Sequence, residues 1–236
     1  MLRGVELWET TKQLVRNAGQ IMRERRVAVL VCIAVVAMGC SFLFSRDLEW
    51  NRQLTTGRSN GLKDFAFQVS RWGDLPTGTF IIAGGLLLAG FAGKRRDWRT
   101  AGVACLLAAS VAGLSVKALS ASLGRPRPNK AGITRLQGPT LNRDFQSFPS
   151  GHSATSFGTA GALAVVLPPV GVPVLVGAVG VGWSRLYLGA HYPSDVWTGA
   201  WVGLVTGLAL GLAARRCRLG STHGDSSTTQ LPRPDR

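Results

Sequence analysis

The chain has 236 residues, of which 46% are hydrophobic, and its mean hydropathy is +0.17. Lys and Arg number 27 against 12 Asp and Glu, so the formal net charge is +15. This much apolar surface excludes an intrinsically disordered protein, and the length indicates one domain. The charge leaves two classes open, a nucleic-acid binder and a membrane protein with basic loops, and the positions of the charges decide between them.

The apolar residues are concentrated in six blocks that are separated by polar segments. A helix needs about 20 apolar residues to cross the hydrocarbon core of a bilayer, and the blocks have 14 to 19. A short block alone is typical of a buried helix in a soluble protein, but six in one chain favour membrane spans. The sequence therefore predicts an all-α polytopic membrane protein whose six transmembrane helices form a bundle. In chain order, the blocks are residues 27–44, 75–93, 100–116, 153–167, 170–183 and 196–214.

Glycines recur within two of these blocks. Gly84 and Gly85 are adjacent in the second block, and the last block carries a glycine at every fourth position. Small residues at this spacing let helices approach closely in lipid. We therefore expect close helix contacts at these glycines, which in the last block are Gly199, Gly203, Gly207 and Gly211.

Basic residues cluster in three segments that six spans would place on one side of the membrane. They are residues 1–26 with six Lys or Arg, residues 94–99, and the start of the segment after residue 214. Because cytoplasmic loops are enriched in Lys and Arg, we expect both termini in the cytoplasm. The expected organisation is a cytoplasmic N-terminal segment (1–26), a membrane domain (27–214) and a disordered cytoplasmic tail (215–236).

The source that the composition favours is bacterial. The chain contains 22 Arg and only 5 Lys, a balance that favours a GC-rich genome. We therefore expect a multi-pass protein of the bacterial inner (plasma) membrane. Nucleic-acid binding is not expected, because the Lys and Arg residues are scattered over loops and form no basic stripe with stacking aromatics.

Two loops on the predicted extracytoplasmic face carry ionisable residues that the topology does not require. One is residues 118–152 and the other is residues 184–195. Ionisable residues at membrane depth indicate a functional site. We expect the loops to converge there and to form the active site on the outer side of the membrane.

The residue types in these loops suit phosphate. Ser150 and Gly151 precede a predicted helix, whose first backbone N–H groups bind anions. Lys117, Arg127 and Arg185 add positive charge and hydrogen-bond donors suited to phosphate oxygens.

Two histidines and a carboxylate in the same loops can transfer a phosphoryl group. Asp195 lies four residues after His191 and can accept the proton of one imidazole nitrogen, which leaves the other nitrogen as a nucleophile. His152 can then donate a proton to the leaving group. The sequence has no carboxylate cluster to bind Mg²⁺ or Zn²⁺, so we expect neither a metal nor another cofactor.

These residues resemble those of the type 2 phosphatidic acid phosphatase superfamily, which includes lipid phosphate phosphatases and vanadium haloperoxidases. The family's second motif, Pro-Ser-Gly-His, is complete at residues 149–152, and its third is complete at Ser184, Arg185, His191 and Asp195. The 31 residues between His152 and Ser184 lie within the family's range. The resemblance includes the six-span layout and so extends over nearly the whole chain.

The first motif departs from the family pattern, which is Lys, six residues, then Arg-Pro. Here seven residues separate Lys117 from Arg125, and nine separate it from Arg127. If Arg127 fills the motif, the expected lysine position is occupied by Ser120, one helical turn after Lys117 and on nearly the same face. We expect Lys117 to serve from there, and of Arg125 and Arg127 we favour Arg127 as the phosphate contact.

The resemblance implies a role for each of these residues. His191 would be the nucleophile that becomes phosphorylated, Asp195 would orient it, and His152 would protonate the leaving oxygen. The phosphate would be held by Lys117, Arg127 or Arg125, Arg185 and the backbone of Ser150 and Gly151.

The expected function is a membrane lipid phosphatase that releases inorganic phosphate through a phosphohistidine. The substrate would be a lipid phosphomonoester or diphosphate of the phosphatidate or polyprenyl diphosphate type, with lipid A phosphate or phosphatidylglycerophosphate as the alternative. A vanadate-dependent haloperoxidase is less expected, because those relatives are soluble. A non-catalytic lipid binder is also less expected, because the histidine and aspartate set is complete.

A few other polar residues near these loops are open to two interpretations. Residues 72–74 (Trp-Gly-Asp) either cap the site or anchor the chain at the membrane interface, and we favour the anchor. Lys130, Arg135 and Arg143 are either plain loop charges, which we favour, or contacts to an anionic headgroup.

Overall fold

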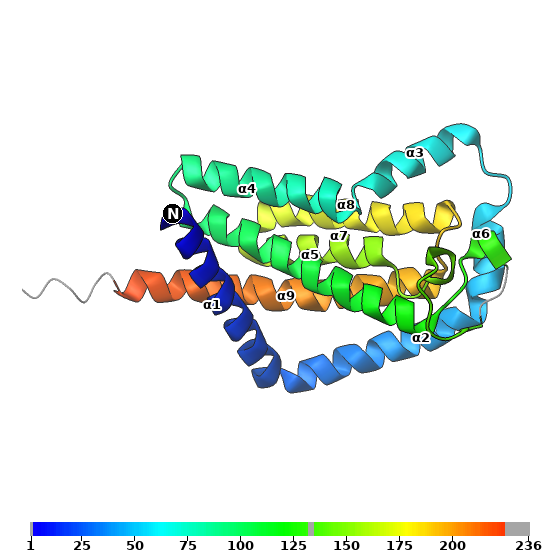
Figure 1. Ribbon diagram of the computed structural model, residues 1–236, viewed down its shortest axis with the longest axis horizontal. Helices are drawn as coiled ribbons and strands as arrows, with labels where there is room; N and C mark the ends of the chain where they lie inside the picture. The colour runs from blue at the N-terminus through cyan, green and yellow to red at the C-terminus, as the bar shows by residue number, and fades with distance from the viewer. Residues whose placement is uncertain (1, 132–134, 225–236) are drawn as a thin grey trace, which may run out of the picture.

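A computed structural model describes residues 2–131 and 135–224, and every regular element in these ranges is helical (Figure 1). The predicted all-α fold class is therefore confirmed. In chain order the elements are α1 (Leu2–Glu24), α2 (Arg26–Thr55), α3 (Asn60–Arg71), the π-helical turn η1 (Leu75–Thr79), α4 (Phe80–Ala92), α5 (Arg96–Leu123), α6 (Pro128–Ala131), the 3₁₀ turn η2 (Arg143–Phe145), α7 (Gly151–Val166), α8 (Pro168–Tyr187) and α9 (Pro193–Gly224).

The six apolar blocks lie within helices, but several helices run well beyond them. A helix continues through polar residues until a residue that ends it, as Gly124 does for α5. Gly124 has a φ of 63°, in the left-handed region that favours glycine, and its N–H donates to the carbonyl of Ser120 (3.2 Å). Because α2 and α5 extend past their apolar blocks, they carry polar side chains to the end of the bundle where the loops converge.

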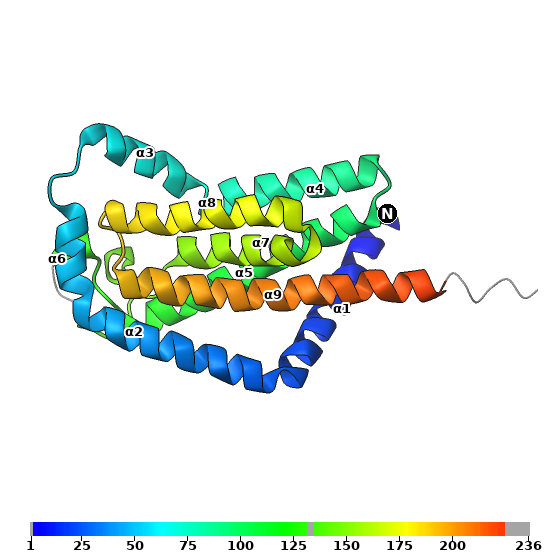
Figure 2. The same ribbon diagram turned by 180° about the vertical axis from the view of Figure 1, so that it is seen from behind.

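Helix α7 is the centre of the bundle. It packs against α5, α8 and α9, and Figure 2 shows it between α8 and α9. Its N-terminus is fixed by Ser150, whose Oγ accepts a hydrogen bond from the N–H of Ser153. The first residues of α7 are therefore held rigidly where the loops meet.

The glycines of α9 allow its close contact with α7, as expected from their spacing. A Cβ on Gly203 would lie only 2.8 Å from the backbone nitrogen of Gly158 in α7. Gly84 and Gly85 differ from the expectation, because each faces open space where a Cβ would meet nothing within 4 Å. In α4 the close contact is made by Gly90 instead, where a Cβ would lie 2.9 Å from the backbone nitrogen of Arg99 in α5.

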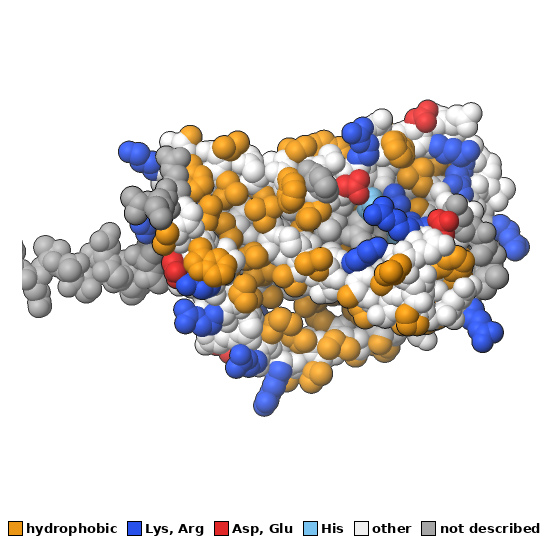
Figure 3. Space-filling view, in the orientation of Figure 1, with side chains coloured by type: hydrophobic (Ala, Val, Ile, Leu, Met, Phe, Trp, Pro, Cys, Tyr) orange, Lys and Arg blue, Asp and Glu red, His pale blue; other side chains and the backbone are white. Residues whose placement is uncertain are grey.

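Within the part of the chain that the structure describes, four helices are long and apolar enough to cross a membrane by length and composition. They are α2, α5, α8 and the part of α9 from Pro193 to Cys217. Hydrophobic side chains cover much of the middle of the bundle surface in Figure 3. Large apolar side chains on the helices are strongly exposed, such as Leu88 (74%) and Leu114 (71%). Since α4 has 13 residues and α7 has 16, shorter than a full span needs, the six-span count stays a prediction.

The basic segments lie at one end of the bundle, where α1, the connection from α4 to α5 and the end of α9 are found (Figure 1). There, α1 is paired with α5 through Arg99 and Glu6 (2.8 Å) and with α9 through Arg216 and Glu24 (2.5 Å).

The ends of the chain are more helical than the sequence suggested. The predicted polar segment 1–26 contains α1, and α9 continues to Gly224, past the predicted boundary at residue 214. Arg, Ala and Leu favour helix there, and a Gly follows only at residue 220. Residues 225–236 of the predicted tail lie outside the described residues.

We predict that Gly203→Ala destabilises the protein, although alanine favours a helix interior by about 1 kcal/mol over glycine. The added Cβ would meet the α7 backbone and force α9 outward. Thermal unfolding of the solubilised protein measures the effect, and Gly84→Ala is the matched control. Equal melting temperatures for the two variants would contradict the close contact.

Candidate active site

A cavity of about 290 Å³ opens at the end of the bundle opposite the chain termini. Five of the predicted site residues line it: Lys117, Arg127, Gly151, His152 and His191. Figure 3 shows Lys and Arg side chains gathered around a histidine in this region. Segments far apart in the chain thus meet here, as the sequence predicts, and surround the cavity with positive charge.

His191 faces the cavity with one ring nitrogen and is tied to the protein by the other. Its Nδ1 lies 2.7 Å from the backbone carbonyl of Ser147 and 3.6 Å from Oδ2 of Asp195. Because a carbonyl only accepts hydrogen bonds, Nδ1 carries the proton. The lone pair of Nε2 then points toward the cavity, where Nη1 of Arg127 is 3.5 Å away.

Burial keeps this imidazole neutral. The pKa of His191 is lowered from 6.5 to about 4, above all by burial. The hydrogen bond and charge of Asp195 raise it, and the charges of Arg127 and Arg185 lower it further. At neutral pH the Nε2 lone pair is therefore available for bond formation.

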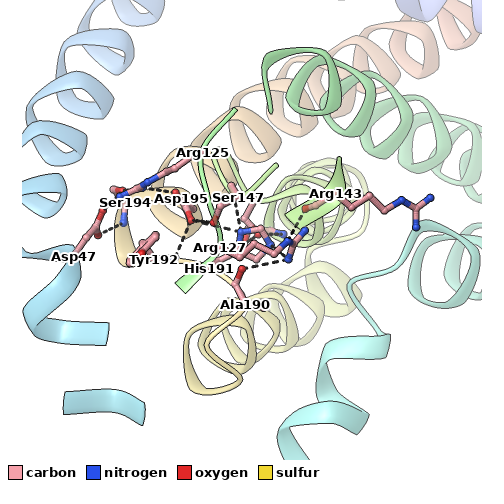
Figure 4. Close-up of polar contacts among 12 residues, drawn as sticks. Asp47, Arg125, Arg127, Arg143, Ser147, Ala190, His191, Tyr192, Ser194 and Asp195 are labelled. Carbon is pink, nitrogen blue, oxygen red and sulfur yellow. Dashed lines mark hydrogen bonds and ion pairs between the residues drawn. The ribbon is translucent and has the colours of Figure 1, made fainter. Parts of the chain in front are cut away.

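Asp195 contacts the imidazole less directly than the sequence suggested, because the Ser147 carbonyl is closer to Nδ1. Its Oδ2 accepts hydrogen bonds from the Oγ of Ser147 (2.5 Å) and the N–H of Tyr192 (2.8 Å). Ser147 thus lies between the carboxylate and the ring, with its hydroxyl on Asp195 and its carbonyl on His191 (Figure 4). Asp195 holds the imidazole mainly through this residue.

Arg125 is buried away from the cavity and pairs with two carboxylates. Nη1 donates to Oδ1 of Asp195 (2.5 Å) and Nη2 to Oδ2 of Asp47 (2.6 Å). Its guanidinium lies 4.2 Å from the ring centre of Phe44 and 4.3 Å from that of Tyr192. Of the two arginines considered for phosphate, the structure brings only Arg127 to the cavity.

Asp47 completes this buried network, and sequence reasoning missed it. Its carboxylate accepts hydrogen bonds from the N–H (3.0 Å) and the Oγ (2.5 Å) of Ser194 as well as from Arg125. In the sequence, Asp47 follows an apolar block and has the appearance of a residue in an external loop. Only the continuation of α2 beyond Phe44 brings it into the bundle.

Backbone carbonyl oxygens hold the guanidinium of Arg127 in place beside His191. Nε donates to the carbonyl of Arg143 (3.0 Å), and Nη1 donates to the carbonyl of Ala190 (3.2 Å). Burial lowers the pKa of Arg127, but arginine remains charged at any physiological pH. A fixed positive charge therefore lies beside the unprotonated Nε2 of His191.

Lys117 reaches the cavity in spite of its shifted spacing. Its Nζ donates to Oε1 of Gln146, whose Nε2 is bonded to the carbonyl of Thr140 (2.8 Å). Ser120, one turn later, lines the same cavity, so both positions on α5 face it as the helical spacing predicts.

Arg185 and Ser150 lie behind the cavity lining. Nη1 of Arg185 donates to the Oγ of Ser70 (2.5 Å), and its Nε is buried without a hydrogen-bond partner. Ser150 is fully buried as the cap of α7, and the next residue, Gly151, reaches the cavity.

The other polar residues considered from the sequence differ in position. Arg143 lines the cavity, whereas Arg135 is exposed and outside its lining, and the side chain of Lys130 lies outside the described part of the chain. Trp72 is 53% exposed, but Asp74 lines the cavity. Within the described ranges, no three His, Cys, Asp or Glu side chains gather as metal ligands would.

Comparison with known proteins gives one family. Residues 101–218, half of the chain, match the PAP2 superfamily. The chain is 33% identical over 110 residues to a lipid A 1-phosphatase of Rhizobium etli, which covers 45% of this chain and 47% of that protein. It is also 36% identical over 139 residues to a decaprenylphosphoryl-5-phosphoribose phosphatase of Mycolicibacterium smegmatis. That match covers 59% of this chain and 72% of the relative. The chain therefore spans about half the length of the lipid A 1-phosphatase.

A solved structure shares the fold. The transmembrane PAP2-type phosphatidylglycerolphosphate phosphatase of Bacillus subtilis superposes with a TM-score of 0.57, over 86% of this chain and 98% of that one. The sequence identity is 22%, so this likeness concerns the fold alone.

We predict that Arg125→Met strongly destabilises the protein, because it leaves two buried carboxylates without their cation. Breaking a buried ion pair from one side costs about 3–5 kcal/mol. Thermal unfolding in detergent measures the loss, with Arg143→Met as the exposed control. A melting temperature of Arg125→Met equal to that of the control would show that the network carries no such weight.

We predict that His191 is neutral at pH 6, with its proton on Nδ1, and takes up a second proton only near pH 4. Because its ordinary pKa is 6.5, the unfolded chain takes up this proton first, so the stability that His191 contributes falls as pH drops from 6.5 toward 4. Nitrogen NMR of histidine-labelled protein reports both tautomer and titration. A midpoint near 6.5 at this residue would contradict the burial effect.

Proposed function

The chain belongs to the PAP2 superfamily, and on that basis we propose that it is an integral membrane lipid phosphatase that works through a phosphohistidine on His191. One observation carries this proposal: a neutral imidazole presents an unprotonated Nε2 to a cavity that Arg127, Lys117 and His152 also line. A nucleophile, cations for a phosphate and a proton donor thus share one small space.

In the first step, the Nε2 lone pair of His191 attacks phosphorus and the bond from phosphorus to the leaving oxygen breaks. His152 gives its proton to that oxygen, so the lipid departs as an alcohol or as a lipid monophosphate. Nδ1 of His191 keeps its proton and donates it in a hydrogen bond to the Ser147 carbonyl, while Asp195 stabilises the positive charge that develops on the ring.

In the second step, water attacks phosphorus and the bond from phosphorus to Nε2 breaks. His152, now without its extra proton, takes one from the water. Inorganic phosphate is released and both histidines return to their starting states. Arg127 and Lys117 in the cavity lining, with the charge of Arg185 behind them, balance the phosphate charge through both steps.

The proposed substrate is a lipid that carries a phosphomonoester or a diphosphate. The relatives named above are phosphatases of lipid A and of decaprenylphosphoryl-5-phosphoribose. A cavity of about 290 Å³ is far too small for a whole lipid, and the residues assigned above contact only the phosphate. The choice among phosphatidate, phosphatidylglycerophosphate, polyprenyl diphosphate and lipid A phosphate therefore depends on surfaces outside the cavity.

We further propose six spans, with both termini in the cytoplasm of a bacterium and the cavity at the outer face of its plasma membrane. The support is that the basic segments and the cavity lie at opposite ends of the bundle (Figure 1). Lys and Arg favour the cytoplasmic side, so a cavity at the other end would meet lipid headgroups of the outer leaflet.

We predict that purified protein releases phosphate from at least one of these four lipids and that His191→Ala lowers kcat by about 10³-fold or more. Malachite-green detection of phosphate measures the reaction, and Arg135→Gln, a charge loss outside the cavity, should retain activity. Phosphate release by His191→Ala at the wild-type rate would overturn the assigned nucleophile. Halide oxidation with peroxide and vanadate, without phosphate release, would favour a haloperoxidase instead.

A further inference from the structure

Asp74 contacts the proposed proton donor and belongs to none of the three sequence motifs. Its Oδ1 lies 2.8 Å from Nε2 of His152. It follows α3 in the chain, lines the cavity and is 49% exposed at its side chain. Neither interpretation of residues 72–74 from the sequence, a cap or an interface anchor, includes this contact.

The backbone next to Asp74 is hydrogen-bonded to α7. The Oγ1 of Thr155 donates to the carbonyl of Gly73 (2.5 Å), which ties this segment to the helix that carries His152. Gly73 has no room for a side chain, because a Cβ there would lie 2.5 Å from Cγ1 of Val181 and 3.0 Å from Cβ of His152. The glycine therefore lets the chain pass against His152 and places the next residue on its ring.

The charges around His152 make this carboxylate important. Lys117, Arg127 and Arg143 line the same cavity, His191 faces His152 there, and Arg185 on α8 is near enough to act on it. Burial and the charges of Arg185 and Arg127 disfavour a protonated His152 imidazole, yet a proton donor must carry that proton. Among the described residues that line the cavity, Asp74 is the only carboxylate.

We propose that Asp74 is a positioning residue for His152: its carboxylate holds the Nε2 proton, so that Nδ1 is the nitrogen that exchanges protons with substrate. This rests on the proposed phosphatase function. With both nitrogens protonated, Nδ1 gives its proton to the leaving oxygen while Nε2–H stays on Asp74. The Nδ1 lone pair then takes the proton of the attacking water, which restores the imidazolium.

The test compares Asp74→Asn with the wild type on two phosphate esters that differ in their leaving group. An alkyl phosphate needs a proton on its leaving oxygen, whereas p-nitrophenyl phosphate hardly does. We expect Asp74→Asn to lower kcat on the alkyl ester by about 10²-fold and on the aryl ester by far less. Asp64→Asn, an exposed acid on α3, is the control and should change neither.

Two further readouts keep the proposal testable. The alkaline limb of the kcat profile on the alkyl ester should move about one pH unit lower in Asp74→Asn, because the imidazolium has lost its counter-charge. In a His152→Ala background the same substitution should have no added effect. Asp74→Glu should recover part of the activity, and unchanged thermal unfolding of Asp74→Asn would exclude misfolding.

Equal losses on both esters, an unmoved pH profile, or an additive effect on His152→Ala would each overturn the role of Asp74. Nitrogen NMR of His152 decides the matter without turnover, since Asp74→Asn should lower the pH at which this ring titrates. Absence of phosphate release by the wild type would instead count against the proposed function. The two failures are therefore distinct.

Discussion

The hydrogen bond from His191 Nδ1 to the carbonyl of Ser147 is the contact on which the site depends (Figure 4). It fixes the proton on one ring nitrogen and leaves the lone pair of the other toward the cavity. The position of that carbonyl is in turn set by the hydroxyl of Ser147 on Asp195. Arg125 then connects Asp195 to Asp47, so that the orientation of one imidazole is supported from α2 and α9 together.

This construction separates two kinds of charge. The buried set of Asp47, Arg125 and Asp195 is internally paired and holds geometry. The charges of Lys117, Arg127 and Arg143 instead line an open cavity, where a phosphate would supply the opposing charge. An arginine in the sequence motif can belong to either set, and Arg125 and Arg127, two residues apart, belong to one each.

Much of this organisation could be predicted from the sequence. The apolar blocks predicted the helices. The expected order of spans placed Lys117 and the loops with Arg127, His152 and His191 on one face. Both predictions depend only on residue type and on the order of segments along the chain. Contacts made by the backbone carry no such signal, so the carbonyl of Ser147 could not be foreseen. Asp47 and Asp74 were also missed as partners, since each looks like an ordinary loop charge until α2 is extended or Gly73 is packed against His152.

The most direct measurement is to trap the phosphorylated protein from a rapid-quench reaction under alkaline conditions and to locate the phosphate by mass spectrometry and NMR. Because Nδ1 of His191 is held by Ser147, the phosphate must bond to Nε2 of this residue. We predict an acid-labile, alkali-stable phosphohistidine at residue 191 that is substituted on Nε2. A phosphate on His152, on Nδ1 of His191, or on no histidine during steady turnover would contradict it.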